Sequence, residues 1–267
     1  QALRPYPQYQ TITSNFNESG ASNYNALQVT AQKRFSKGLE FLVSYTLSRN
    51  YSNTSSGFST FSAQPVNTYN RRAEFSLANS DIPNSLAISG IYELPVGPGK
   101  ALLNRKGIAG HALGGWQLGW VTRYHSGTPV AITASNVLPL FNGCNRPNLL
   151  KGPNPSLTRA NFDPSTAPIY NINAFSQPSD YSFGDAPRVI GSLRDFPYLN
   201  EDGTRAKGGH FSERVDMQFR AEFFNVFNRT IFGGGDTAYS PSNANFGYVG
   251  SQANSPRQGQ LGLRLRF

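Results

Sequence analysis

Cysteine is almost absent from this 267-residue chain, and the only one present, Cys144, has no partner within the sequence. It lies in FNGCNRPNLL, a segment with the composition of a loop. No disulfide can therefore form inside the chain. In an exported protein an odd cysteine suggests a partner outside the sequence, and an unpaired loop thiol is the alternative.

Long hydrophobic runs are also missing. No stretch reaches the ~18 consecutive apolar residues that are typical of a membrane-spanning helix. Hydrophobic residues make up 38 % of the chain, which contains 26 glycines and 18 prolines, and its aromatic content of 13 % argues against disorder. This composition is typical of an all-β chain with long loops. The membrane is not excluded, because transmembrane strands need only about 9–11 residues of alternating character.

Acidic residues are fewer than basic ones, 15 against 24, which gives a net charge of +9. A basic chain raises the question of nucleic-acid binding. However, the lysines and arginines are scattered, and none of the Lys/Arg-rich runs of about five to eight residues that mark such binding is present. We therefore expect no nucleic acid among the partners.

Alternation of apolar and polar residues is the strongest pattern in the sequence. Between residues 213 and 228, for example, Met217 and Phe219 share one face of a strand while Asp216 and Arg220 share the other. The same reading predicts seven strands, at about 24–36, 39–50, 84–94, 115–126, 197–207, 212–228 and 257–267. Only YLNEDGTRAK, at 198–207, is polar on both faces, so that strand is either bent and close to a rim or wrongly paired.

The connections alternate between short and long. Ser36, Lys37 and Gly38 form a tight turn, whereas 50–83, 127–190 and 229–255 are long and rich in Ser, Asn, Pro or Gly. Tight turns at one rim and long loops at the other are typical of a transmembrane barrel. A soluble sandwich also alternates, but its strands are shorter. We predict an all-β fold, an antiparallel up-and-down meander that forms a partial transmembrane β-barrel of about seven strands with long extracellular loops.

This fold predicts which side chains face lipid and which face a wet lumen. The lipid-facing set includes Leu27, Val43, Leu118, Phe219 and Leu263, and the lumen-facing set includes Gln28, Ser44, Gln117, Arg220 and Arg264. Trp116, Trp120, Tyr124 and Phe227 are interpreted as lipid-facing or aromatic-belt residues. A sugar-stacking platform is the alternative for these aromatics.

Four segments resemble the C-terminal barrel of TonB-dependent receptors, in particular the Oar-like group with a carboxypeptidase-regulatory-like domain. They are residues 22–50, 114–133, 211–233 and 255–267, and RAEFFNVFN within the third is the most specific. The resemblance implies an outer-membrane receptor that takes up an unidentified ligand, without enzymatic activity or a cofactor. Its partners would be outer-membrane lipid and, through a plug domain, the TonB complex.

Seven strands are too few for a barrel of this type, which has about 22 strands and a plugged lumen. The chain opens QALRPYPQYQ, without an initiator methionine or the basic and apolar regions of a signal peptide. We therefore expect residues 1–267 to be the C-terminal fragment of an outer-membrane β-barrel domain. The plug domain and signal peptide would then lie upstream.

The C-terminus resembles the signal that the barrel-assembly machinery of the outer membrane reads. That signal has a polar residue, a glycine two positions on, then hydrophobic residues and a terminal aromatic, which here are Gln260, Gly262, Leu265 and Phe267. An exposed last strand could pair with the machinery by β-augmentation before the barrel closes.

No catalytic or metal-binding motif stands out. His111, His125 and His210 lack the spacing of a metal site, and residues 125–129 form a strand exit and not a nucleophile elbow. The glycines at 233–235 and the residues 200–204 match neither a phosphate loop nor a calcium loop. A small outer-membrane enzyme or porin, and a soluble β-sandwich adhesin or lectin, are the alternative functions.

Overall fold

The computed structural model describes residues 6–9, 19–54, 65–67, 69–104, 107, 110, 113–134, 145–157, 163–212 and 215–267, with only the backbone of 209–212 and 215. His111 and Cys144 lie outside the described residues, so the interpretations of both stay predictions. None of the described helices is long and apolar enough to cross a membrane.

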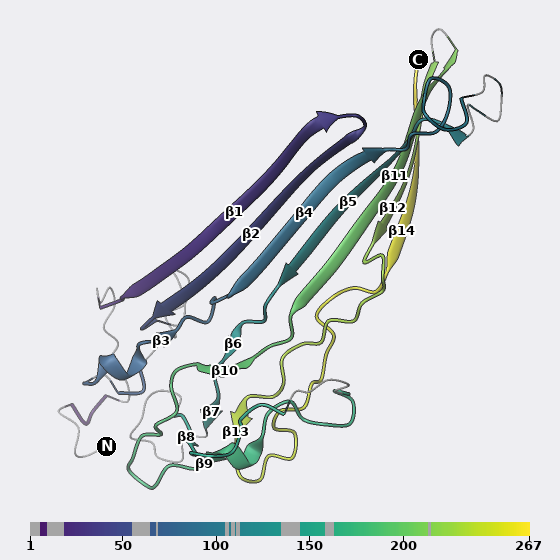
Figure 1. Cartoon of the computed structure of the whole chain (residues 1–267). Coiled ribbons are helices and arrows are strands. Elements are labelled where there is room, and N and C mark those ends of the chain that lie inside the picture. Colours follow the sequence, from purple (N-terminus) through teal and green to yellow (C-terminus); the bar gives the residue numbers. More distant parts are fainter. Residues whose placement is uncertain are drawn as a thin grey trace.

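Most of the regular structure belongs to one antiparallel sheet (Figure 1). Its long strands are β1 (Ser22–Ser36), β2 (Leu39–Ser52), β4 (Asn84–Glu93), β5 (Trp116–His125), β11 (Tyr198–Ser212), β12 (Val215–Phe224) and β14 (Gln258–Arg266). Each pairs with the next in chain order, and the short β3 (Ser76–Leu77) also pairs with β2. The predicted seven-stranded up-and-down meander is confirmed.

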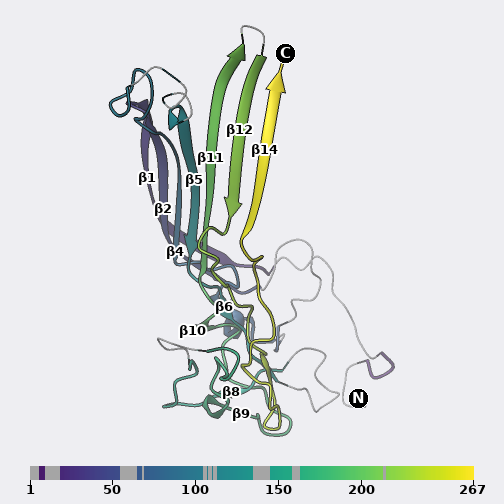
Figure 2. The same cartoon turned by 90° about the vertical axis from the view of Figure 1, so that its right-hand side faces the viewer.

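The sheet is open. Among the described residues β1 pairs only with β2, and β14 pairs only with β12. Figure 2 shows the strands as a single curved layer, with the long connections gathered at one end of it. The all-β fold is therefore a partial barrel, as the sequence predicts.

The tight turn between β1 and β2 follows from its two central residues. Lys37 and Gly38 have φ values of 51° and 80°. Positive φ at both positions is typical of a type I′ turn, whose twist matches that of a two-stranded hairpin. Glycine adopts this conformation without strain, which explains why the strands on either side can pair immediately.

Two strand boundaries differ from the prediction. The strand expected at 212–228 ends at Phe224, because Asn225 turns to a φ of 51° and its side-chain oxygen accepts from Arg229 N at 2.8 Å. Phe227 therefore lies beyond the strand and is 66 % exposed. The polar strand expected at 197–207 is longer than predicted, because β11 runs from Tyr198 to Ser212 between β5 and β12.

The ends of the sheet are also less uniform than predicted. The 94–115 connection, at the same end as the β1–β2 turn, is no tight turn, although alternation of short and long connections was expected. Its described part folds back on itself, since Leu102 N donates to Pro95 O at 2.8 Å and Gly97 N donates to Leu102 O at 2.9 Å.

The long connections form a compact unit at the other end, which we call the loop body (residues 65–83, 126–197 and 225–257, as far as described). It contains the 3-10 helices η1 (Arg71–Glu74) and η2 (Ile172–Ala174). Its short strands are β3, β6 (Pro129–Val130), β7 (Thr133–Ala134), β8 (Asn148–Leu149), β9 (Phe175–Ser176), β10 (Ile190–Arg194) and β13 (Ala238–Tyr239).

The hydrophobic core among the described residues lies in the loop body and not along the sheet. It is a cluster of aliphatic and aromatic side chains, namely Val130, Ile132, Ala134, Ile169, Tyr170, Ala174, Phe175, Ile190, Leu193, Tyr239 and Phe246. Rings from distant segments meet there, as in the edge-on contacts of Phe246 with Phe175 and Tyr239, with centroids 5.7 and 5.8 Å apart. This core could not be predicted from the sequence, because these residues show no periodicity.

Candidate functional site

The strand registers align the main apolar rows of six of the seven long strands, all except β11, on one face of the sheet. Leu27 of β1 pairs with Leu47 of β2, and Val43 of β2 pairs with Ile88 of β4. Further along, Tyr92 pairs with Leu118, and Phe219 pairs with Leu263. The five residues predicted to face lipid therefore share a face, which we call the apolar face.

The residues predicted to face the lumen share the opposite side, the polar face. Thr30 pairs with Ser44, and Gln218 pairs with Arg264. Glu93 pairs with Gln117, whose amide also donates to the Glu93 carboxylate at 3.1 Å. Carboxylates, guanidinium groups and amides along this face require water.

None of the described residues covers most of the apolar face. Leu261 is 73 % exposed, Leu263 is 64 % exposed and Leu27 is 59 % exposed. A soluble sheet would bury such a face against a second layer, and each large side chain left in water forgoes roughly 1.5–3 kcal/mol. An apolar solvent outside the protein explains the uncovered face, and a lipid bilayer supplies one.

Aromatic packing within the apolar face is specific. The indole of Trp120 lies over Gly90 in the neighbouring strand, where a Cβ atom would come within 2.4 Å of the ring. Glycine at position 90 therefore allows the ring to lie flat on β4.

The exception on the apolar face is β11. Its pairing with β5 and β12 places Glu201, Arg205 and Lys207 in the apolar row, opposite Thr122, Leu118 and Trp116 of β5. The sequence left open whether this doubly polar strand was rim-bound or wrongly paired. The pairing was right, and the strand lies inside the sheet.

Glu201 is neutralised at the boundary between the sheet and the loop body. Arg229 Nε donates to its two carboxylate oxygens at 2.9 and 3.0 Å, and the Tyr124 hydroxyl donates to the same carboxylate at 2.5 Å. Glu201 is only 6 % exposed. Tyr124 and Arg229 thus satisfy a charge that could not otherwise remain on this face.

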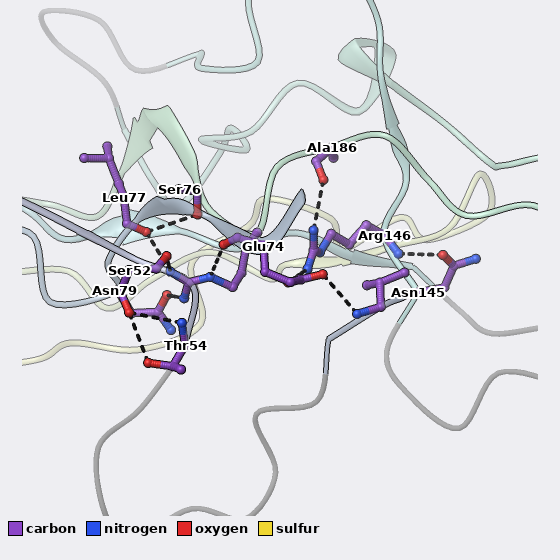
Figure 3. A network of polar contacts seen from close by, with 11 residues as sticks. Ser52, Thr54, Glu74, Ser76, Leu77, Asn79, Asn145, Arg146 and Ala186 are labelled. Carbon is purple, nitrogen blue, oxygen red and sulfur yellow. Dashed lines mark hydrogen bonds and ion pairs between the residues drawn. The ribbon is translucent and has the colours of Figure 1, made fainter. Parts of the chain in front are cut away.

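A buried polar network fastens the loop body to the end of β2 (Figure 3). Arg188 donates to three backbone oxygens, Glu74 O at 3.1 Å, Ser52 O at 2.6 Å and Leu77 O at 3.1 Å, and to Asn79 Oδ1 at 3.1 Å. Burial lowers the pKa of Arg188, and the nearby Glu74 carboxylate opposes this effect.

The carboxylate of Glu74 extends the network to a second loop. It forms an ion pair with Arg146, whose guanidinium also donates to Ala186 O at 3.5 Å. Figure 3 shows Glu74 between Arg146 on one side and the group around Ser52, Leu77 and Asn79 on the other. Three segments far apart in the sequence are thereby joined.

A second buried carboxylate, Asp81, holds the loop body to β2. Its side chain is 0 % exposed and pairs with Arg194 at 2.6 Å and with Arg49 at 3.5 Å. Asp81 also accepts from Asn50 N at 2.8 Å, and Arg194 donates to Gly127 O at 3.0 Å. Sequence reasoning missed both networks, because isolated charges in long polar loops carry no spacing that would identify them.

An open cavity of about 520 Å³ lies on the loop body. Its lining includes Tyr170, Asn171, Asn243, Phe246 and Tyr248. Burial and the negative charge of Asp195 raise the pKa of the Tyr170 phenol. Rings beside amide groups give this cavity both apolar and hydrogen-bonding walls.

The residues of the suggested assembly signal all belong to the last strand or its end. Gln260 and Gly262 are on the polar face, opposite Glu222 and Arg220, and Leu265 is on the apolar face opposite Met217. Phe267 follows the strand and is 95 % exposed. These residues therefore lie on, or directly after, a strand that has one edge without a partner among the described residues.

Among the residues set aside in the sequence, those that the structure describes in full lie in ordinary structural positions. His125 ends β5, stacks on Tyr198 with centroids 5.0 Å apart and contacts Ser126 O through Nδ1 at 2.9 Å. Residues 200–204 are part of β11, and 233–235 lie in the loop body. Within the described part of the chain, no three His, Cys, Asp or Glu side chains are grouped as a metal site.

Comparison with known proteins agrees with this geometry. The family model described as outer membrane beta barrel domain matches residues 1–260. No curated protein and no solved structure matches the chain.

We expect a positive charge on the apolar face to be costly and the same charge on the polar face to be tolerated. Val29 and Thr30 are neighbours on opposite faces of β1, and Val29 is 52 % exposed. Val29→Arg should destabilise the barrel by about 2–4 kcal/mol if it lies close to the bilayer midplane, and Thr30→Arg by much less. Urea unfolding of the full-length protein in lipid vesicles measures the difference. Equal effects would contradict the assignment of the faces.

We expect loss of the Glu74 carboxylate to loosen the loop body. Glu74→Ala leaves the buried Arg146 guanidinium without its ion pair, which costs about 3–5 kcal/mol in comparable buried pairs. The control is Glu93→Ala, because its pair with Lys100 is exposed and is worth about 0–1 kcal/mol. Limited proteolysis of the loops on whole cells should cut only the Glu74→Ala protein faster. Identical cleavage of both variants would show that the network does not hold the loops.

Proposed function

Because the chain belongs to the outer membrane beta barrel domain family and its location is the outer membrane, we propose that it is part of a TonB-dependent receptor that takes up a ligand. Residues 1–267 supply seven long strands of the barrel and a folded loop body at the end with long connections. Since such loops are extracellular in this class of barrel, the loop body faces the ligand.

The observation that carries the proposal is the open sheet. The outer edges of β1 and β14 have no strand partner among the described residues, and unpaired backbone groups cost several kcal/mol each in hydrocarbon. Further strands must therefore complete the barrel, and we propose that they come from the same protein, upstream of residue 1. A barrel with many more than seven strands is wide enough to hold a plug domain.

The loop body supports the role of a receptor. Its own hydrophobic core and the two buried ion networks fix the loops in one arrangement, as a specific binding surface requires. The cavity beside Tyr170 and Tyr248 is a candidate for the first contact with ligand. We propose no catalytic activity and no cofactor.

The alternatives are less well supported. A soluble β-sandwich does not agree with membership in an outer-membrane family. A porin needs a closed barrel of its own, whereas the edge strands of this sheet do not pair with each other among the described residues. A small outer-membrane enzyme also needs a complete barrel.

A receptor with a plug should differ from a porin in electrical behaviour. We expect the full-length protein, purified from outer membranes, to give no steady conductance in a planar bilayer and to bind the purified periplasmic domain of TonB. A plug closes the lumen, and its coupling segment engages TonB. Stable open channels together with no TonB binding would contradict the proposal and favour the porin alternative.

We also propose that the C-terminal strand engages the barrel-assembly machinery through Gln260, Gly262, Leu265 and Phe267. Deleting Phe267 from the full-length protein should lower its amount in the outer membrane, because an exposed terminal aromatic contributes little to the finished sheet. Immunoblots of outer-membrane fractions measure this amount. The control is Tyr69→Ala in the loop body, which is 96 % exposed and lies outside the signal. Normal insertion without Phe267 would contradict the assignment.

A further inference from the structure

The polar row of β11 on the apolar face needs a physical explanation. Arg205 is exposed there between Leu118 of β5 and Ala221 of β12. One row further toward the short-turn end, Lys207 lies between Trp116 and Phe219. An arginine in contact with hydrocarbon at the bilayer midplane is destabilising, so the Arg205 side chain must reach a polar group.

Glu201, on the same row, is not that polar group. Its carboxylate is already occupied by Arg229 and Tyr124, at the loop-body end of the strand. Asp216, at the short-turn end of β12, is on the polar face. Among the described residues Arg205 forms no ion pair, and its guanidinium lies over the ring of Trp116.

Both cations converge on Trp116. The guanidinium carbon of Arg205 is 4.0 Å from the ring centroid, and Lys207 Nζ is 5.5 Å from the same centroid. Phe219 packs edge-on against this indole, with centroids 6.1 Å apart. The three side chains and the indole therefore form one small cluster.

The cluster lies toward the short-turn end of the sheet. Trp116 is the first residue of β5, so its ring marks the level at which that strand leaves the apolar band. Arg205 starts one row deeper, opposite Leu118, and reaches toward this level. A long basic side chain that extends from the hydrocarbon to the interface in this way is snorkelling.

Two cations beside an interfacial indole match the headgroup of a phospholipid. Tryptophan prefers the headgroup level of the bilayer, and a guanidinium binds phosphate oxygens in a bidentate arrangement. A lipid whose acyl chains lie on Leu118 and Phe219 would bring its phosphate to Arg205 and Lys207. A phosphate dissolved in water does not reach this face, because the face is covered by hydrocarbon.

We propose that Arg205, Lys207 and Trp116 form a binding site for the phosphate of an anionic phospholipid in the leaflet at the short-turn end. The bound lipid neutralises Arg205 and seals this part of the barrel surface. The proposal rests on the outer-membrane location and is independent of coupling to TonB.

Native mass spectrometry of the full-length protein tests the site. The protein is extracted in mild detergent, stripped of lipid and titrated with phosphatidylglycerol or with phosphatidylcholine. The unmodified protein should retain phosphatidylglycerol preferentially. The double variant Arg205→Gln/Lys207→Gln should bind it about thirtyfold more weakly, since each of the two basic residues close to the membrane surface contributes about 1 kcal/mol.

The matched control is Arg123→Gln/Arg264→Gln, which removes the same charge from the polar face and should leave retention unchanged. Arg205→Lys keeps the charge and should retain most of the lipid, which separates loss of binding from loss of folding. Equal retention of the two lipids by the unmodified protein would overturn the proposal. So would a folded double variant that retains as much phosphatidylglycerol as the control.

Discussion

Backbone hydrogen bonding in an apolar solvent is the constraint on which the rest of the structure depends. In hydrocarbon, every N–H and C=O group must find a partner within the protein. The continuous registers from β1 to β14 satisfy this requirement for the five strands inside the sheet and for one edge of each outer strand. The remaining edges set the requirement for further strands. The apolar solvent also explains why the leucines of the sheet can remain uncovered by protein, since lipid replaces a second protein layer.

The sheet and the loop body are adapted to different surroundings. The sheet needs hydrocarbon on one face and water on the other, and so it has no core of its own. The loop body is surrounded by water and buries its own aromatic cluster. Glu74, Arg188 and Asp81 connect the two parts, because their partners include Ser52 of β2 and Asn50. The position of the loops relative to the barrel wall therefore depends on buried charge, where loss of one partner is costly.

Most of the sheet could be predicted from the sequence because alternation is a local property, and Leu27 and Gln28 reveal opposite faces as neighbours. The early end of β12 could not, since the apolar pattern continues to Phe227 while the positive φ of Asn225 ends the strand. The loop-body core was equally hidden. Phe175 and Phe246 meet only after the chain has folded, and their neighbours in the sequence follow no period. The two ion networks depend on the same long-range folding.

β11 shows why topology can override side-chain pattern. β5 and β12 both run from the short-turn end toward the loop body, so they could pair directly only as parallel strands. An antiparallel meander requires a returning strand between them, whatever its side chains. Residues 198–207 fill that place with two polar rows, and the outward row departs from the rule that holds for the other six strands. Such departures are expected where a residue serves a purpose other than stability. Glu201 serves the junction with the loop body, and Arg205 and Lys207 reach the level of Trp116, where the bilayer becomes polar.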